Sequence, residues 1–262
     1  MPKTYNILAV GDVCGKPGLD IIRSKLPGLK RHYDISFCVV NGENADMRGL
    51  TPDQADMLLT FGADVVTLGN HAWSNRSILP YLDDNRFILR PGNFAPQAPG
   101  RGWDVFPSPM GNIFVMSLIG RLGMDSMTDS PFFALDRALS SDAAGRCRIR
   151  LVDFHAEATS EKLAMRHYAA GRVTCLWGTH THVQTSDAEV TRDGAGYITD
   201  LGMTGAVDGI LGVKPETSVD HFLGNPRLRY ETAAGAAKLE CCIFEVFPDS
   251  GKALRAEALR IT

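Results

Sequence analysis

The sequence has no long apolar run, no low-complexity tract and no signal-peptide pattern. A helix that spans a bilayer needs about 18 to 20 apolar residues, and no segment approaches that length. The N-terminal stretch MPKTYNILAVGD lacks the longer apolar region and the small-residue cleavage site of a secretory signal. Neither export nor membrane insertion is expected, and the predicted location is the cytoplasm.

The chain also lacks a CxxC pair, although it contains six cysteines. Cys38 and Cys175 lie in strand-like apolar runs, where a cysteine usually behaves as a small buried hydrophobic residue. Reduced thiols are therefore expected, and a fold held together by disulfides is excluded.

A strong overall charge is missing as well, because 27 basic and 30 acidic residues leave a formal charge of −3. That balance gives no field able to hold a polyanion, and neither a basic helix nor an aromatic stacking motif is present. No stable nucleic-acid complex is expected. With 262 residues, 44% of them hydrophobic, and no linker or repeat, the chain is predicted to form a single domain over residues 1–262.

What the first part of the chain does contain is an alternation of strand and helix patterns. Tyr5–Val10, Ile35–Val40 and Asp64–Leu68 are predicted strands, each followed by polar residues. Residues 19–30 have helical spacing with a break or kink expected near Pro27. Residues 51–62 begin with Thr, Pro and a Gln three residues after the Thr, which predicts a capped helix that ends at Gly62. This alternation predicts an α/β fold.

The second half is less regular. Strands are predicted at residues 112–119, 147–154, 173–177, 196–199, 239–247 and 254–261, and a helix at 160–170. Residues 204–235 are rich in Gly and Pro, show no clear periodicity, and are expected to form a long loop over one face.

Polar residues that suit metal binding or proton transfer gather where the predicted strands end, the edge at which open α/β sheets bind ligands. Two neighbouring divalent ions need oxygen and imidazole donors and a carboxylate that bridges them. His180 and His182 are two residues apart, so in an extended segment both project to the same side. The candidate residues are Asp12, Glu43, Asn44, Asn70, His71, His155, His180 and His182.

Each candidate also has an ordinary structural reading, such as a turn aspartate, an Asx turn, a helix cap or a buried imidazole. Taken together, these structural explanations account poorly for the pattern, because four of the seven histidines would have to fall at strand ends by accident. His32, His167 and His221 are left as surface or structural residues.

The sequence does not match the motifs of other catalytic classes. In GDVCGKPG, a P-loop would need Gly in place of Val10 and Ser or Thr in place of Pro17. The chain has no GxSxG elbow, and no GxGxxG follows the first strand. Lys16 and Arg48 lie near the candidate site in sequence and could touch phosphate, or could simply be solvated.

The motifs GDVCGKPG (11–18), NGEN (41–44), GNH (69–71), DFHAE (153–157) and GTHTH (178–182) resemble those of the calcineurin-like metallophosphoesterases, and more narrowly the bacterial YmdB-type branch. The resemblance runs in order through nearly the whole chain. It implies a four-layer α-β-β-α sandwich of two mixed sheets flanked by helices, with a binuclear metal site at one edge.

Carried over residue by residue, the resemblance implies two ions that share Glu43 as the bridging carboxylate. Asp12, Asn44 and His182 would hold one ion, and Asn70, His155 and His180 the other. His71 would stay unligated and face the substrate.

Two positions depart from the usual calcineurin-like pattern. Cys14 stands where a histidine is usual, but in the YmdB-type branch Asn44 fills that vacancy, so Cys14 is not expected to be a ligand. Ala72 stands where many members carry an acid that orients the adjacent histidine, which leaves the orientation and the pKa of His71 open.

The implied activity is hydrolysis of 2′,3′-cyclic nucleotides by a metal-bridging hydroxide, with the 2′ bond opened, the 3′-phosphate left and His71 as the acid. The implied cofactors are two divalent or mixed-valence ions, iron first, with manganese or magnesium as substitutes. Two alternatives remain open: a phosphomonoesterase or nucleotidase of the same superfamily, and a regulatory metal-binding scaffold with vestigial activity. The partner would be a small phosphate ester, and a homo-oligomer is left open.

Overall fold

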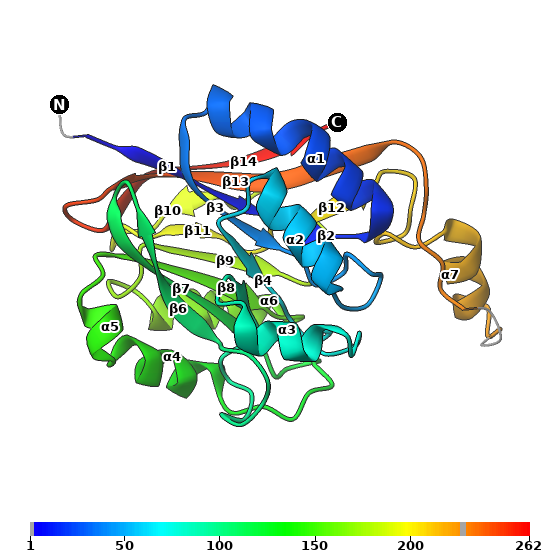
Figure 1. Cartoon of the computed structure of the whole chain (residues 1–262), viewed down its shortest axis with the longest axis horizontal. Coiled ribbons are helices and arrows are strands. Elements are labelled where there is room, and N and C mark those ends of the chain that lie inside the picture. Colours follow the sequence, from blue (N-terminus) through cyan, green and yellow to red (C-terminus); the bar gives the residue numbers. More distant parts are fainter. Residues whose placement is uncertain (1–2, 226–228) are drawn as a thin grey trace.

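The computed structural model describes residues 3–225 and 229–262. Its first sheet has eight strands in the order β2-β12-β13-β1-β3-β4-β5, with β14 beside β13 (Figure 1). β1, β3, β4 and β5 run parallel, whereas β13 is antiparallel to β1 and to β14. The bounds are β1 Tyr5–Val10, β2 Asp12–Val13, β3 Ile35–Asn41, β4 Val65–Thr67, β5 Ile88–Leu89, β12 Met203–Ala206, β13 Ala237–Phe247 and β14 Lys252–Ile261.

The second sheet has six strands in the order β10-β11-β9-β8-β7-β6. Its central strands β7, β8, β9 and β11 run parallel, and β6 and β10 pair antiparallel at its edges. The bounds are β6 Trp103–Ser108, β7 Gly111–Ile119, β8 Ile149–His155, β9 Cys175–Thr179, β10 Glu189–Val190 and β11 Gly196–Ile198.

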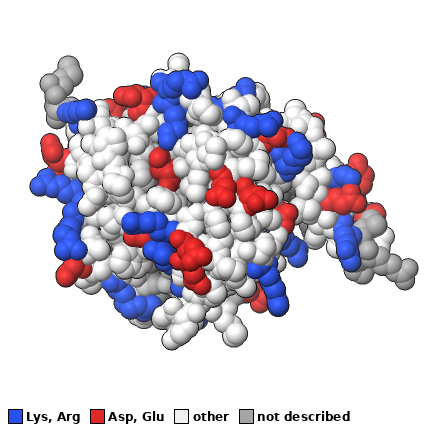
Figure 2. Space-filling model, viewed as in Figure 1, with Lys and Arg blue, Asp and Glu red and all other residues white. Residues whose placement is uncertain are grey.

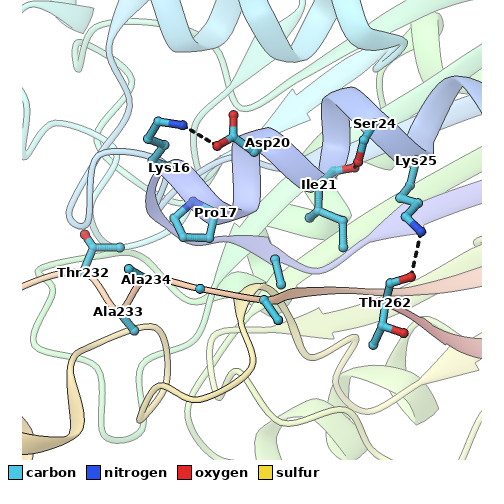
Figure 3. A pocket seen from close by; sticks show the side chains of 13 residues that line it. Lys16, Pro17, Asp20, Ile21, Ser24, Lys25, Thr232, Ala233, Ala234 and Thr262 are labelled. Atoms are coloured by element: carbon cyan, nitrogen blue, oxygen red, sulfur yellow. Dashed lines mark hydrogen bonds and ion pairs between the residues drawn. The ribbon is translucent and has the colours of Figure 1, made fainter.

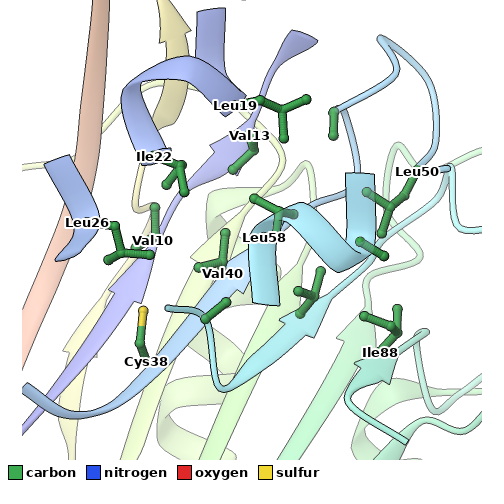
Figure 4. Packing of buried hydrophobic residues seen from close by; sticks show 14 of the residues in the cluster. Val10, Val13, Leu19, Ile22, Leu26, Cys38, Val40, Leu50, Leu58 and Ile88 are labelled. Atoms are coloured by element: carbon green, nitrogen blue, oxygen red, sulfur yellow. The ribbon is translucent and has the colours of Figure 1, made fainter. Parts of the chain in front are cut away.

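Three buried clusters define the layers. Helices α1 (Gly15–His32), α2 (Pro52–Phe61) and α3 (Ile78–Asp84) pack on the outer face of the first sheet, where Leu26 and Leu58 meet Val40 (Figure 4). A second cluster, which includes Phe37 and Trp177, fills the space between the sheets. The third joins the outer face of the second sheet to α4 (Pro131–Leu139), α5 (Asp142–Gly145) and α6 (Thr159–Tyr168). The expected four-layer α-β-β-α sandwich is confirmed.

The predicted strands and helices recur with shifts of a few residues. Thr51 caps α2 with a complete capping box: its Oγ1 accepts from the Gln54 N–H at 3.2 Å, and its own N–H donates to Gln54 Oε1 at 3.0 Å. Of the break or kink expected near Pro27, the break is absent, because α1 continues through Pro27 to His32. Proline removes one helical N–H, but Ile22 and Leu26 are fully buried, so packing on the sheet holds the helix together.

The long loop predicted over residues 204–235 is interrupted by a short strand and a helix. β12 lies at its start, and α7 (Pro215–Phe222) extends away from the body of the molecule (Figure 1). β12 has four residues, too few to show a period of two, and its strand geometry comes from pairing with β2 and β13. Residues 226–228 of this segment lie outside the described part of the chain.

All six cysteines are buried and none forms a disulfide. In the part of the chain that the structure describes, no helix combines the length and apolarity needed to cross a bilayer. Basic and acidic side chains are interspersed on the face shown in Figure 2, in keeping with the near balance of charge in the sequence.

Candidate metal-binding and active site

The parallel strands bring the candidate residues to one edge of the molecule. Polar residues follow β1, β3 and β4 of the first sheet, and others end or follow β8 and β9 of the second. The eight candidates form one connected cluster, although they come from segments far apart in the chain. Each predicted site residue therefore lies within 4 Å of at least one other.

His155, the last residue of β8, is fully buried at the centre of this cluster. Its Nε2 lies 2.9 Å from Asn70 Oδ1, 3.0 Å from His180 Nδ1 and 3.2 Å from Glu43 Oε1. Its Nδ1 lies 3.7 Å from Asp12 Oδ1. Two imidazoles, two carboxylates and an amide oxygen thus converge on one small volume.

His182 forms a second centre beside the first. Its Nε2 lies 3.1 Å from Asn44 Nδ2 and 3.9 Å from Asp12 Oδ1. The Cys14 thiol is also near, with Sγ 3.7 Å from His182 Nδ1. Asp12 therefore lies between His155 and His182, and it connects the two halves of the cluster.

Three carboxylate oxygens in this cluster are buried without a hydrogen-bond partner among the described residues: Asp12 Oδ1 and both oxygens of Glu43. Glu43 Oε1 is close to His155 without the geometry of a hydrogen bond. A buried carboxylate with no partner costs several kcal/mol, so native proteins rarely leave one without a compensating cation. These oxygens are what a metal ion would satisfy.

Each of the three clustered histidines has its other ring nitrogen held by an acceptor. His155 Nδ1 lies 3.0 Å from Thr179 Oγ1, and that hydroxyl in turn donates to buried Asp153 at 2.7 Å. His182 Nδ1 donates to the Leu211 carbonyl at 3.0 Å, and His180 Nε2 lies 3.2 Å from Glu157 Oε2. Such partners fix the tautomer and the ring orientation of metal-binding histidines. No role was assigned to these partners from the sequence, although Asp153, Glu157 and Thr179 lie within the DFHAE and GTHTH motifs.

The pKa values show that the cluster favours positive charge among its carboxylates. Burial lowers the pKa of His155, but Glu43, Asp12 and Asp153 outweigh it and raise the value to about 9. Burial likewise opposes protonation of His182, whereas Cys14 and Asp12 raise its pKa to about 10. The raised pKa values of both histidines show that the electrostatic potential in the metal-free cluster is negative, which favours the binding of cations.

His180 and the two carboxylates behave differently. Burial and the neighbouring charge of His155 lower the pKa of His180 to about 3. Burial raises the pKa of Asp12 to about 6. Burial would also raise the pKa of Glu43, but the charge of His155 lowers it on balance.

The loop after β9 holds two histidines in left-handed backbone conformations, with φ of 102° at His180 and 63° at His182. Such values are costly for a residue other than glycine and persist only where the surroundings enforce them. The His180 N–H donates to Asp12 Oδ2 at 3.1 Å, and both the N–H and the hydroxyl of Thr181 donate to Asp200. The segment is therefore not extended, contrary to the expectation from the sequence, and the tertiary structure dictates where these imidazoles point.

Gly69 is required by close approach. A Cβ at this position would lie 2.1 Å from Glu43 Oε2 and 2.2 Å from His155 Cδ2, far inside contact distance. Any side chain would push the two groups apart, so Gly69 allows β4 to deliver Asn70 directly against them.

His71 lies at the rim and is partly buried. Its Nδ1 is 3.3 Å from Ser74 Oγ, and its Nε2 is 3.4 Å from Asn70 Nδ2. Ser74 is thus the side chain in contact with Nδ1 of His71, whereas Ala72 has no polar side-chain atom. Burial lowers the pKa of His71 below its usual value, with Glu43 opposing and Arg48 contributing.

Of the two basic candidates from the sequence, Lys16 lies apart from the cluster, whereas Arg48 is close enough to His71 to lower its pKa. Lys16 forms an ion pair with Asp20, and its side chain is 83% exposed. It lines a surface cavity of about 670 Å³ between α1 and residues 232–237, where no predicted site residue lies (Figure 3). The guanidinium carbon of Arg48 lies 5.8 Å from the centroid of the Tyr230 ring.

Among the described residues, no three His, Cys, Asp or Glu side chains are already gathered around one point as a metal ion requires. The ligand roles therefore remain predictions.

Comparison with known proteins decides the family. The model of the family described as "YmdB-like protein" matches residues 8–259. The chain belongs to the YmdB-like family. A relative from Bacillus subtilis (strain 168), a 2′,3′-cyclic-nucleotide 2′-phosphodiesterase, is 40% identical over 256 residues, which cover 97% of this chain and 96% of the relative.

Solved structures agree with this family assignment and with the fold. A crystal structure described as a novel phosphatase from Mycoplasma pneumoniae has a TM-score of 0.92 at 33% identity and covers 100% of this chain and 94% of that one. A putative 5′-nucleotidase from Staphylococcus aureus, at 15% identity and a TM-score of 0.64, covers 98% of this chain and 54% of that one and shares the fold. The expectation that this YmdB-like chain is an enzyme, a hydrolase of the phosphodiesterase type, is confirmed.

Proposed function

We propose that the chain is a two-metal phosphodiesterase that opens 2′,3′-cyclic nucleotides at the 2′ bond and leaves the 3′-phosphate. The observation that carries the proposal is the set of buried carboxylate oxygens of Asp12 and Glu43, which have no hydrogen-bond partner among the described residues and face ring nitrogens of His155 and His182. The cyclic-nucleotide substrate is the one named for the relative from Bacillus subtilis.

The donor set fits two cations. Glu43 would bridge them, Asp12, Asn44 and His182 would hold one, and Asn70, His155 and His180 the other. Mixed oxygen and imidazole ligation suits iron and manganese, and we propose iron as the native metal. The outer hydrogen bonds of the three histidines support these roles, because each leaves one ring nitrogen facing the carboxylates.

Two divalent ions would bring four positive charges, and Asp12 and Glu43 would bring two negative ones, while the other ligands are neutral. The resulting net charge of about +2 suits a phosphodiester anion. When bound, the ions supply a lowered pKa for the attacking water and neutralise charge that grows on the phosphoryl oxygens.

His71 has the remaining role. It lies beside Asn70 at the rim, and Ser74 fixes its Nδ1, so Nε2 is the nitrogen that faces the site. We assign His71 as the group that donates a proton or a hydrogen bond to the leaving ribose oxygen.

The test is turnover with a defined metal load. Protein stripped with a chelator and reloaded with iron, manganese or magnesium is assayed against 2′,3′-cyclic AMP and against the 2′- and 3′-monophosphates. We expect metal-dependent formation of 3′-AMP and slower attack on the monoesters. Preferred monoester hydrolysis would establish the phosphomonoesterase alternative, and a loaded protein without turnover would establish the regulatory scaffold.

A further inference from the structure

A second group of basic side chains lies at the opposite end of the second sheet. A pocket of about 580 Å³ lies where β8 and β9 begin, whereas the metal cluster lies where these strands end. β8 has seven residues at about 3.3 Å each, so the two sites are about 20 Å apart. The charged residues that line the pocket are Arg148, Arg150, Arg172, Arg192, Lys252 and a single acid, Asp193.

Arg150 is the fixed element of this pocket. Its Nε donates to the carbonyls of Ala144 at 3.2 Å and Cys147 at 3.1 Å, and its Nη1 donates to the carbonyl of Arg172 at 3.1 Å. These partners are neutral, and Arg150 forms no ion pair within the described residues. The guanidinium is therefore half-buried and held in one orientation, while its charge is left without a carboxylate.

The surrounding cations add to this excess charge. Arg148 donates to the Asp249 carbonyl rather than to a carboxylate. Arg192 and Lys252 are exposed, and the described residues provide no ion-pair partner for either side chain. Arg172 is the exception, because it pairs with Asp136 at 2.5 Å. The chain as a whole has a formal charge of −3, so this group of unpaired cations is a local concentration of positive charge. A local positive field of this kind attracts anions.

We propose that this pocket binds a small ligand with two or more linked phosphate groups. Guanidinium groups donate to phosphate oxygens, and Arg150, whose Nε and Nη1 are held by carbonyls, would donate from Nη2 and lose little freedom on binding. The cavity volume lies within the range of about 300 to 1,000 Å³ of small-molecule sites, which exceeds what a single phosphate needs. A free polyphosphate and a nucleoside polyphosphate share this chemistry. The pocket is separate from the metal centre and does not depend on its function.

The experiment is calorimetric titration of the metal-loaded protein with inorganic tripolyphosphate and, separately, with ATP, in about 0.15 M salt. The test variant is Arg192→Ala/Lys252→Ala, which removes two exposed cations. The matched control is Arg23→Ala/Arg31→Ala, two exposed arginines of α1 on the far side of the sandwich.

We expect the wild type and the control to show a site in addition to the metal centre, and the test variant to bind there at least tenfold more weakly with unchanged phosphodiesterase turnover. Tighter binding of ATP than of tripolyphosphate would identify a nucleoside polyphosphate, and equal binding a free polyphosphate. An isotherm that is the same for the test variant and the wild type would overturn the proposal.

Discussion

Lys162 donates to Asp200 at 2.7 Å, and both side chains are almost completely removed from solvent. The same carboxylate accepts from the N–H of Thr181 at 3.2 Å, from its hydroxyl at 2.8 Å and from the N–H of Gly202 at 2.9 Å. This ion pair therefore holds the residue between His180 and His182.

We expect Lys162→Met to lower the free energy of unfolding by about 3 to 5 kcal/mol, because it leaves the Asp200 charge buried without its cation. The double variant Lys162→Met/Asp200→Leu should regain most of that loss, since no charge remains buried. Its metal dissociation constant should still rise about 10- to 100-fold, because Thr181 has lost its acceptor. Urea unfolding of the metal-free protein and competition with a chelator measure the two quantities. Wild-type metal affinity in the double variant would show that the pair serves stability alone.

Gly69→Ala should damage the metal centre directly. The added Cβ would overlap Glu43 Oε2, so we expect metal affinity to fall about 10- to 100-fold and stability by about 1 to 3 kcal/mol. Gly28→Ala is the matched control, because nothing lies within 4 Å of its Cβ in α1, and there alanine should stabilise by about 0.5 to 1 kcal/mol. Similar effects of the two substitutions on metal binding would contradict the close-approach argument.

Metal loading should release protons. The pKa values of about 9 for His155 and about 10 for His182 mean that both are protonated near pH 7 in the metal-free protein, whereas a metal binds neutral imidazole. His180, with a pKa of about 3, is already neutral. We expect about two protons to leave per protein loaded at pH 7.

The sign of the pH dependence follows: affinity rises with pH until both imidazoles lose their protons near pH 9 to 10, and it falls further below about pH 6 as Asp12 is protonated. Calorimetry in two buffers of different ionisation enthalpy counts the protons. His167→Asn, at an exposed histidine of α6, should leave the count unchanged. Loading without proton release would show that the two imidazoles are not ligands.

Glu43→Ala should lose at least one ion, because the proposed bridging carboxylate disappears. Metal content after gel filtration, measured by mass spectrometry, checks this. Glu216→Ala removes an exposed carboxylate on α7 and serves as the control. Full metal content in Glu43→Ala would remove Glu43 from the ligand set.

His71→Ala should lower turnover by about 10² to 10⁴ and keep both ions. Ser74→Ala should have a smaller effect on turnover, because the imidazole remains and only its orientation is released. Single-turnover kinetics separate chemistry from product release. Unchanged single-turnover chemistry in His71→Ala would show that His71 is not the proton donor.

The sequence by itself determined the alternation of strands and helices, the capped start of α2 and the polar residues at the strand ends. These features depend on local patterns, because apolar periodicity and capping chemistry act over a few residues. The eight candidate site residues were readable for the same reason, since each follows a strand and has a side chain of a metal-binding or proton-transfer type.

Only the tertiary structure decided the rest. It showed that α1 passes through Pro27 and that β12 forms within an aperiodic segment, because packing and strand pairing overrode local preference. It also supplied Thr179, Glu157, Ser74 and Asp200 as the partners that orient the histidines. Except for Ser74, which is three residues from His71, these contacts join residues distant in the chain through single hydrogen bonds or ion pairs, and such a contact leaves no periodic trace in a sequence.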